Sequence, residues 1–291
     1  MIRKLPFLLA LVFVFSCSDS KKKSEEMLQE KSKEEIIQVY ANFEKAVKDK
    51  DVSLLQSTFL SKETQLNAYI RTPDGLRKNI FPLEVWTDFL GQMTDPYHIE
   101  ISNIEIVSNG SIAYSIADFK EFYFGDSIAI GKDLFTYVRT PSGWKIVSLS
   151  NTATVLPKDS VSLADFPAGD QKLAEDKINL FFGAVNERDT AKIRSMLLNP
   201  TPFLSLSFSG EKDIDPDSLY SFLKFSEELD QLYGKVNIEK VELRIIDRNM
   251  LIAEVETNID DKFNRRDKLF LVTLFTEEDG QWLVTSLLSE N

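Results

Sequence analysis

The sequence predicts an α+β protein that contains two tandem domains of the same type. Three observations support this: the chain is duplicated, each copy places helices before strands, and the later part of each copy alternates like β-structure. Residues 46–51 (AVKDKD) align with residues 184–189 (AVNERD) at an offset of 138. Residues 142–148 and 280–286, each with a Trp, align at the same offset. A repeat of this length is a whole domain rather than a solenoid unit.

The first part of each copy is predicted to be helical. Residues 34–59 indicate a helix, a turn and a second helix, and residues 173–197 repeat this pattern. Pro82 in one copy and Pro216 in the other suit the first turn of a third helix. The helical spacing is carried in the first copy by Ile36, Ile37, Tyr40, Phe43 and Val47.

Four strands are predicted to follow the helices in each copy. Alternation of Ile112, Tyr114 and Ile116 with small residues is typical of a strand. Helices followed by an antiparallel meander define the α+β class. The predicted strands are 98–107, 111–123, 128–139 and 143–150 in the first copy, and 235–245, 249–258, 267–276 and 281–288 in the second.

The N-terminus is predicted to direct export. Arg3 and Lys4 precede the apolar run 6–15, which is about half the length of a membrane-spanning helix and fits a signal peptide. Residues 14–17 (VFSC) resemble a bacterial lipobox, although Phe15 replaces the usual small residue. The resemblance implies diacylglyceryl transfer to Cys17, cleavage before it and fatty acylation, such as palmitate, of the new amine. The alternative is a plain signal or anchor with an incidental Cys.

Five segments are therefore predicted. The charged tether after Cys17 has Ser18 where an inner-membrane retention signal would have Asp, which favours the outer membrane facing the periplasm. The segments are a signal peptide (1–16), a tether (17–33), a first domain (34–150), a linker (151–169) and a second domain (170–291).

Composition excludes several classes of function. The chain has 46 acidic and 34 basic residues, a net charge of −12, and no basic cluster in its body, so we expect no nucleic-acid partner. One Cys and one His exclude disulfides, Cys-rich zinc sites and Cys–His nucleophile pairs. Asp213, Asp215 and Asp217 lack the Gly and Glu of a calcium loop, and Asp215 is interpreted as a helix N-cap. No cofactor or metal is predicted.

The element order and the Trp-containing last strand resemble the nuclear transport factor 2-like (NTF2-like) superfamily. The residues that carry the resemblance are 43–51 and 131–147 in one copy and 181–189 and 269–286 in the other. It implies cone-shaped domains, each with a curved sheet around a long helix and a pocket at the wide end. Members include ketosteroid isomerases, polyketide cyclases and scytalone dehydratases, but fold alone does not fix function. Trp144 and Trp282 are interpreted as core positions rather than ligand-stacking residues.

Few residues suggest catalysis. The superfamily's enzymes place an Asp, often with His or Tyr, inside the cone, and Asp118 with Tyr114 and Tyr123 could face such a pocket. The only His, His98, is the remaining candidate. The alternative for Asp118 is a surface carboxylate, and the same alternative holds for its counterpart in the repeat, Glu256, and for Glu254.

This reasoning favours a non-enzymatic role: binding of a small apolar ligand or of an envelope protein by a lipid-anchored protein. The other hypothesis is an isomerase or lyase that uses a pocket carboxylate. Segments 134–138 and 269–275 are apolar on both faces, which indicates burial on both sides. They predict an intramolecular pseudo-dimer in which the two sheets dock, with separate domains on a string as the alternative.

Overall fold

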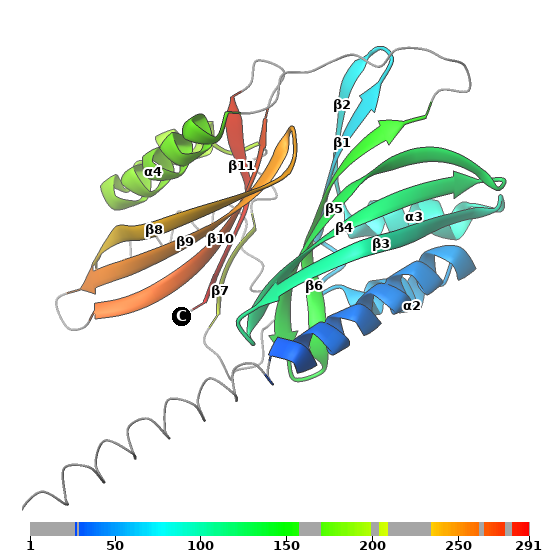
Figure 1. Ribbon diagram of the computed structural model, residues 1–291, viewed down its shortest axis with the longest axis horizontal. Helices are drawn as coiled ribbons and strands as arrows, with labels where there is room; N and C mark the ends of the chain where they lie inside the picture. Colours follow the sequence, from blue (N-terminus) through cyan, green and yellow to red (C-terminus); the bar gives the residue numbers. More distant parts are fainter. Residues whose placement is uncertain are drawn as a thin grey trace, which may run out of the picture.

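The computed structural model describes residue 27 and residues 29–156, 170–198, 204–208, 234–261, 265–276 and 281–290. In these ranges the chain forms helices and two curved sheets, which confirms the α+β class. Figure 1 shows four layers in the order helix, sheet, sheet, helix, so that the sheets face each other. One sheet has the strand order β2-β1-β6-β5-β4-β3 and the other has β7-β11-β10-β9-β8.

The first half of the chain contains the six-stranded sheet and the helices on its inner face. The four strands predicted here are confirmed as β3 to β6, and the helix predicted after Pro82 is confirmed as α3. The elements are the N-terminal helix (29–49), α2 (Val52–Thr58), β1 (Gln65–Thr72), β2 (Gly75–Pro82), α3 (Leu83–Gln92), β3 (Tyr97–Ser108), β4 (Ile112–Tyr123), β5 (Asp126–Thr140) and β6 (Gly143–Val155). Strand β6 extends five residues past position 150, into the segment predicted as linker.

The hairpin of β1 and β2 was not predicted, so an expected sheet of four strands is a sheet of six. Strand β1 pairs antiparallel with β2 and parallel with β6. Asp74 and Gly75 form the Asp-Gly dipeptide that is typical of a tight hairpin turn. Gly75 has a φ of 134°, a conformation that favours glycine. The turn could therefore be predicted from the sequence. Strand β2 could not, because it lies at the edge of the sheet and its residues do not alternate between buried and exposed.

The second half repeats this plan. Its four predicted strands are confirmed as β8 to β11, whereas β7, which pairs parallel with β11, was not predicted. The helix predicted after Pro216, with Asp215 as its N-cap, lies outside the described residues. The elements are α4 (Gln171–Glu187), α5 (Thr190–Ser195), β7 (Leu204–Phe208), β8 (Gly234–Asp247), β9 (Met250–Asp261), β10 (Arg265–Thr276) and β11 (Trp282–Glu290).

The corner between the first two helices is the same in both halves. Lys50 and Arg188 have φ values of 57° and 55°, the left-handed conformation that ends a helix. Each is followed by an aspartate, Asp51 or Asp189, whose side chain accepts a hydrogen bond from the amide three residues later. Such an N-cap starts the next helix. The aligned motif of the sequence repeat is therefore a structural repeat.

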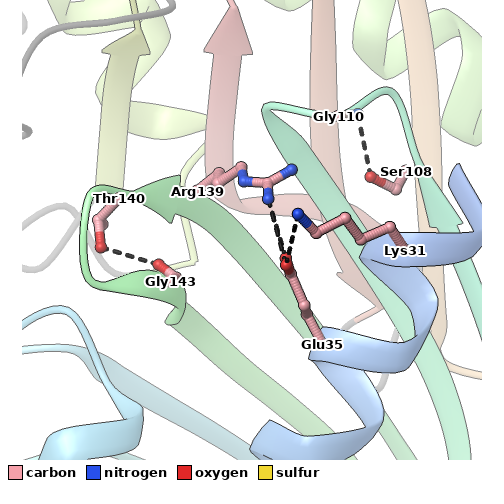
Figure 2. A network of polar contacts seen from close by, with 7 residues as sticks. All are labelled: Lys31, Glu35, Ser108, Gly110, Arg139, Thr140 and Gly143. Atoms are coloured by element: carbon pink, nitrogen blue, oxygen red, sulfur yellow. Dashed lines mark hydrogen bonds and ion pairs between the residues drawn. The ribbon is translucent and has the colours of Figure 1, made fainter. Parts of the chain in front are cut away.

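The N-terminal helix contacts the edge of the first sheet at which β5 turns into β6. Figure 2 shows Glu35 of this helix between Lys31 and Arg139, the latter near the end of β5. Arg139 donates to Glu35 at 3.0 Å, and Lys31 lies 3.8 Å from the same carboxylate. In the next turn, Thr140 donates to the carbonyl of Gly143 at 2.8 Å. Of these contacts, the Arg139–Glu35 ion pair joins the helix to the end of β5.

Each half has its own hydrophobic core between helices and sheet. In the first half, Ile36, Tyr40 and Phe43 of the N-terminal helix are buried against the inner face of the sheet. Trp144 and Trp282 are 3% and 1% exposed in the two cores. Their burial agrees with the interpretation of both as structural positions.

A third cluster lies between the two sheets. Tyr69 stacks on Phe275 with ring centroids 4.3 Å apart. This inter-sheet cluster consists of Tyr69, Ile112, Tyr114, Ile116, Leu134, Val138 and Val147 from the first sheet and Ile246, Met250, Ile252, Leu271, Phe275 and Leu288 from the second. The cluster contains residues from segments 134–138 and 269–275, the two segments whose sequences are apolar on both strand faces.

Polar contacts surround this cluster. The hydroxyl of Tyr114 donates to Glu254 at 2.7 Å. Arg71 pairs with Asp247 at 2.9 Å, and Arg244 pairs with Glu105. The outer faces of the sheets therefore meet through an apolar centre and a charged edge.

Candidate functional site

A cavity of about 270 Å³ lies in the first domain, between the inner face of the sheet and the helices. Phe43 of the N-terminal helix and Trp86 of α3 close it on the helix side. Its apolar wall also includes Phe81, Ile99, Phe119, Ala129 and Ala153, and its polar lining residues are Asn67, Asn79, Tyr97, Glu121, Asp133 and Asn151. A mostly apolar cavity with a few polar groups is the usual form of a small-molecule site.

Two carboxyl groups, Asp133 and Glu121, line this cavity. Asp133 is only 5% exposed, and burial together with the nearby Glu121 raises its pKa well above the usual range. Burial also raises the pKa of Glu121, whereas a hydrogen bond from Tyr97 lowers it. No described residue donates a hydrogen bond to Asp133.

The floor of the cavity contains further polar groups. Asn67 donates to Ser150 at 3.3 Å, but the side-chain oxygen of Asn151 is buried without a hydrogen-bond partner among the described residues. A buried polar atom without a partner costs free energy, typically about 1–3 kcal/mol. A ligand with a donor group would remove this cost.

A chain of hydroxyl groups lies beside Asp133. Ser115 stands 2.7 Å from the hydroxyl of Tyr40 and 2.9 Å from that of Tyr137. Burial raises the pKa of both tyrosines, and the charge of Asp133 contributes in the same direction. These hydroxyls therefore stay protonated and act as neutral hydrogen-bond groups.

A second, open depression adjoins the cavity and shares Tyr97, Glu121 and Ile128 with it. At this mouth, Tyr123 donates a hydrogen bond to Asp95. Phe89 of α3 lines the same depression and is 60% exposed. The mouth therefore combines an exposed aromatic ring with one more carboxylate.

Asp118, the principal catalytic candidate, does not line this cavity. Its neighbours in β4 alternate, so that Phe119 and Glu121 line the cavity and Asp118 lies on the opposite face. There it accepts a hydrogen bond from Asn103 at 2.7 Å and pairs with Lys132. These contacts lower its pKa, which is the opposite of what a general base near neutral pH needs.

The other candidates are also on that outer face or at the rim. Tyr114 packs in the inter-sheet cluster, and burial raises its pKa to about 12. His98 stacks on Phe122 with centroids 4.6 Å apart, while its neighbours Tyr97 and Ile99 line the cavity. The structure therefore does not bring Asp118, Tyr114 and His98 together in a pocket.

The counterparts in the second domain are surface groups or junction groups. Glu256 lies 3.6 Å from Lys240, as an exposed ion pair. Glu254 accepts the hydrogen bond from Tyr114 between the sheets. Cys17, the predicted lipidation site, lies outside the described residues.

Asp133 and Glu121 carry a signal that sequence reasoning missed. Asp133 stands two residues before Phe135 and four before Tyr137, on a strand whose inner face is otherwise apolar or aromatic. A carboxyl group at such a position is a candidate for a perturbed pKa. The alternation along β4 and β5 divides the residues of each strand between two faces of the sheet, but it does not show which face meets the helices.

Within the described ranges, no group of three or more His, Cys, Asp and Glu could hold a metal ion. No helix in that part of the chain is long and apolar enough to cross a membrane.

Comparison with known proteins gives structural neighbours only. No family model and no curated protein matches the chain. An NTF2-like protein with a cystatin-like fold from Novosphingobium aromaticivorans is 15% identical, with 55% of this chain and 95% of that chain covered and a TM-score of 0.36. An NTF2-like protein from Shewanella baltica is 15% identical, covering 44% and 96%, with a TM-score of 0.33. A protein with a cystatin-like fold from Nostoc punctiforme is 18% identical, with 45% of this chain and 95% of that chain covered and a TM-score of 0.33.

Proposed function

We propose that the first domain binds a small, largely apolar ligand in its cavity and that the protein is a non-catalytic binding protein of the cell envelope. The observation that carries the proposal is Asp133, a buried carboxyl group without a hydrogen-bond donor, in a cavity with aromatic walls. Burying such a group costs stability unless it gains a partner. A cost that the fold does not offset is typical of a functional site.

A second candidate function is proton transfer by an isomerase or lyase. The specific observation in its favour is the raised pKa of both Asp133 and Glu121. A carboxyl group with a raised pKa can exchange a proton near neutral pH. We place binding first because the residues proposed for such chemistry from the sequence, Asp118 and Tyr114, lie on the other face of β4.

The test is retention of a ligand by the full-length protein, extracted from its own membrane and examined by native mass spectrometry. Ile128, at the junction of cavity and mouth, offers a variant that closes the site: Ile128→Trp should abolish a retained small-molecule mass. Ile130→Trp is the matched control, because Ile130 stands two residues further along β5 and is 42% exposed. Equal retention by both variants would reject the cavity as the site. A co-purifying protein instead of a small molecule would support the envelope-partner alternative.

The envelope location is a separate part of the proposal. It is supported by the apolar run 6–15, the lipobox-like residues 14–17 and the charged tether. Several acyl chains hold a protein on a membrane where one does not. Cys17→Ala should release the protein from membranes, and labelling with a fatty acid should mark only the unsubstituted chain. Labelling of both, or of neither, would contradict lipidation at Cys17.

A further inference from the structure

The charges around the cavity are of one sign. Asp133 and Glu121 line it, and Asp95 stands at its mouth. No Lys or Arg is among the described residues that line the cavity. Lys50 reaches this region, but its ammonium group is bound at 2.7 Å to the backbone carbonyl of Asp95. A ligand in the cavity therefore meets two carboxyl groups that no lysine or arginine of the described lining neutralises.

The protein does not supply the hydrogen bonds that these carboxyl groups need. The hydroxyl of Tyr97 donates a hydrogen bond to Glu121, whereas Asp133 has no donor among the described residues. The oxygen of Asn151 is a second acceptor without a partner in the same part of the chain. Both are acceptors when Asp133 is ionised, so the missing partner is a donor, and a positively charged donor would satisfy them best.

The rest of the wall also suits a cation. Phe43, Trp86 and Phe119 line the cavity together with Tyr97. The faces of aromatic rings attract ammonium groups, and this attraction strengthens when water is excluded. The same rings provide an apolar surface for the remainder of the molecule.

We propose that the ligand of the first domain is a small organic cation, an ammonium group carried on an apolar or aromatic body. This inference rests on the proposed binding function and specifies the chemical class of its ligand. The ammonium group lies against Asp133 and Glu121, donates to Asp133 and to the oxygen of Asn151, and its body contacts the aromatic wall. The negative mouth and the net charge of −12 favour the approach of cations over anions.

Binding of such a cation depends on pH with a definite sign. The pKa values of Asp133 and Glu121 are raised in the free protein, so at low pH both are neutral and attract a cation weakly. Affinity rises as the pH rises through these pKa values, and proton release accompanies binding. The groups that interact electrostatically with the pair are the hydroxyls of Tyr97, Tyr40 and Tyr137, which remain protonated, and the carboxylate of Asp95 lies at the mouth.

The experiment compares three probes of similar shape with the full-length protein: benzylammonium, benzyl alcohol and benzoate. Isothermal titration calorimetry from pH 5 to pH 8 should show benzylammonium binding at least tenfold tighter than benzyl alcohol at pH 8, with no binding of benzoate. Asp133→Asn should remove most of this preference while binding of benzyl alcohol is unchanged. Glu121→Gln is the second variant, and Asp118→Asn, which removes an equal charge outside the cavity, is the control.

The outcomes separate the inference from the function on which it rests. Equal affinity for benzylammonium and benzyl alcohol would overturn the inference that the ligand is a cation, but it would still support a ligand-binding cavity. A preference for benzylammonium that Asp118→Asn removes as strongly as Asp133→Asn would assign the preference to the overall charge and overturn the site. Absence of binding for all three probes would overturn both.

Discussion

Asp133 in the first domain and Phe270 in the second occupy equivalent points of their strands. Each stands three residues before a shift in strand pairing, at Thr136 in β5 and at Thr273 in β10. Asp133 lines a cavity, whereas Phe270 packs edge to face on Phe182 with centroids 5.2 Å apart. The same strand position therefore carries a carboxyl group at a cavity in one half and a packed aromatic ring in the other.

A second pair of positions shows the same difference. Glu121 in β4 corresponds to Ile259 in β9, at the offset of 138 that relates the two copies. Ile259 is buried in the core of the second domain. Two acidic positions of the pocket are thus apolar in the sister domain. Both copies keep the same framework, the proposed ligand site belongs to the first copy, and the second copy covers the outer face of the first sheet.

The largest expected effect comes from placing a carboxyl group at Phe270, the corresponding apolar position of the second half. Phe270→Asp should lower the free energy of unfolding by about 4 kcal/mol or more, because it removes a buried ring and buries a carboxyl group without a partner. Urea denaturation followed by tryptophan fluorescence measures the loss. The reverse exchange, Asp133→Phe, should cost much less, because a cavity is available to the ring. Equal losses of unfolding free energy in Phe270→Asp and Asp133→Phe would contradict the difference in packing between these two positions.

A smaller effect is expected in the pH dependence of stability. The pKa of Asp133 is raised in the folded state, so its favourable contribution is present below its unfolded pKa and is lost as pH rises through the folded pKa. Asp133→Asn should therefore gain stability relative to the unsubstituted protein as the pH rises above about 4, since the unfolded carboxyl group titrates near 4. Urea titrations at several pH values measure this difference. A constant difference across that range would contradict the raised pKa.

The smallest effect is expected at Asp118 and its counterpart Glu256. Both form ion pairs with a lysine near the surface, and such pairs contribute roughly 0–1 kcal/mol. Asp118→Asn and Glu256→Gln should each change stability by less than about 1 kcal/mol, and neither should change ligand retention. Thermal unfolding and native mass spectrometry check the two statements. Loss of the retained ligand in Asp118→Asn would show that Asp118 contributes to ligand binding, against its position outside the cavity.

The fold was largely predictable because its signals are local. Helical spacing, alternation and the repeated corner at Lys50 and Arg188 each involve few neighbouring residues. Strands β1 and β7 were missed because their parallel partners, β6 and β11, lie about 80 residues away in sequence, and no local pattern announces such a pairing. The turn at Gly75 was the one local signal for the hairpin of β1 and β2.

The pocket was less predictable for a different reason. Strand β4 is buried on both faces, since one face meets the helices and the other meets the second sheet. Alternation correctly placed Asp118 and Tyr114 on one face with Ile112 and Ile116. It could not show that this face meets the sister sheet, so Glu121, three residues beyond Asp118, was overlooked.

The inter-sheet cluster also has a consequence during synthesis. Seven of its thirteen residues belong to the half of the chain that is made first, and their partners are contributed by β8 to β11. At about 5–20 residues per second, some 135 further residues take roughly 7 to 27 s to emerge. Throughout that interval the newborn first domain presents an uncovered apolar sheet face, the kind of surface on which nascent chains aggregate. Joining both copies in one polypeptide limits this vulnerable period to seconds, whereas separate subunits would have to find each other by diffusion.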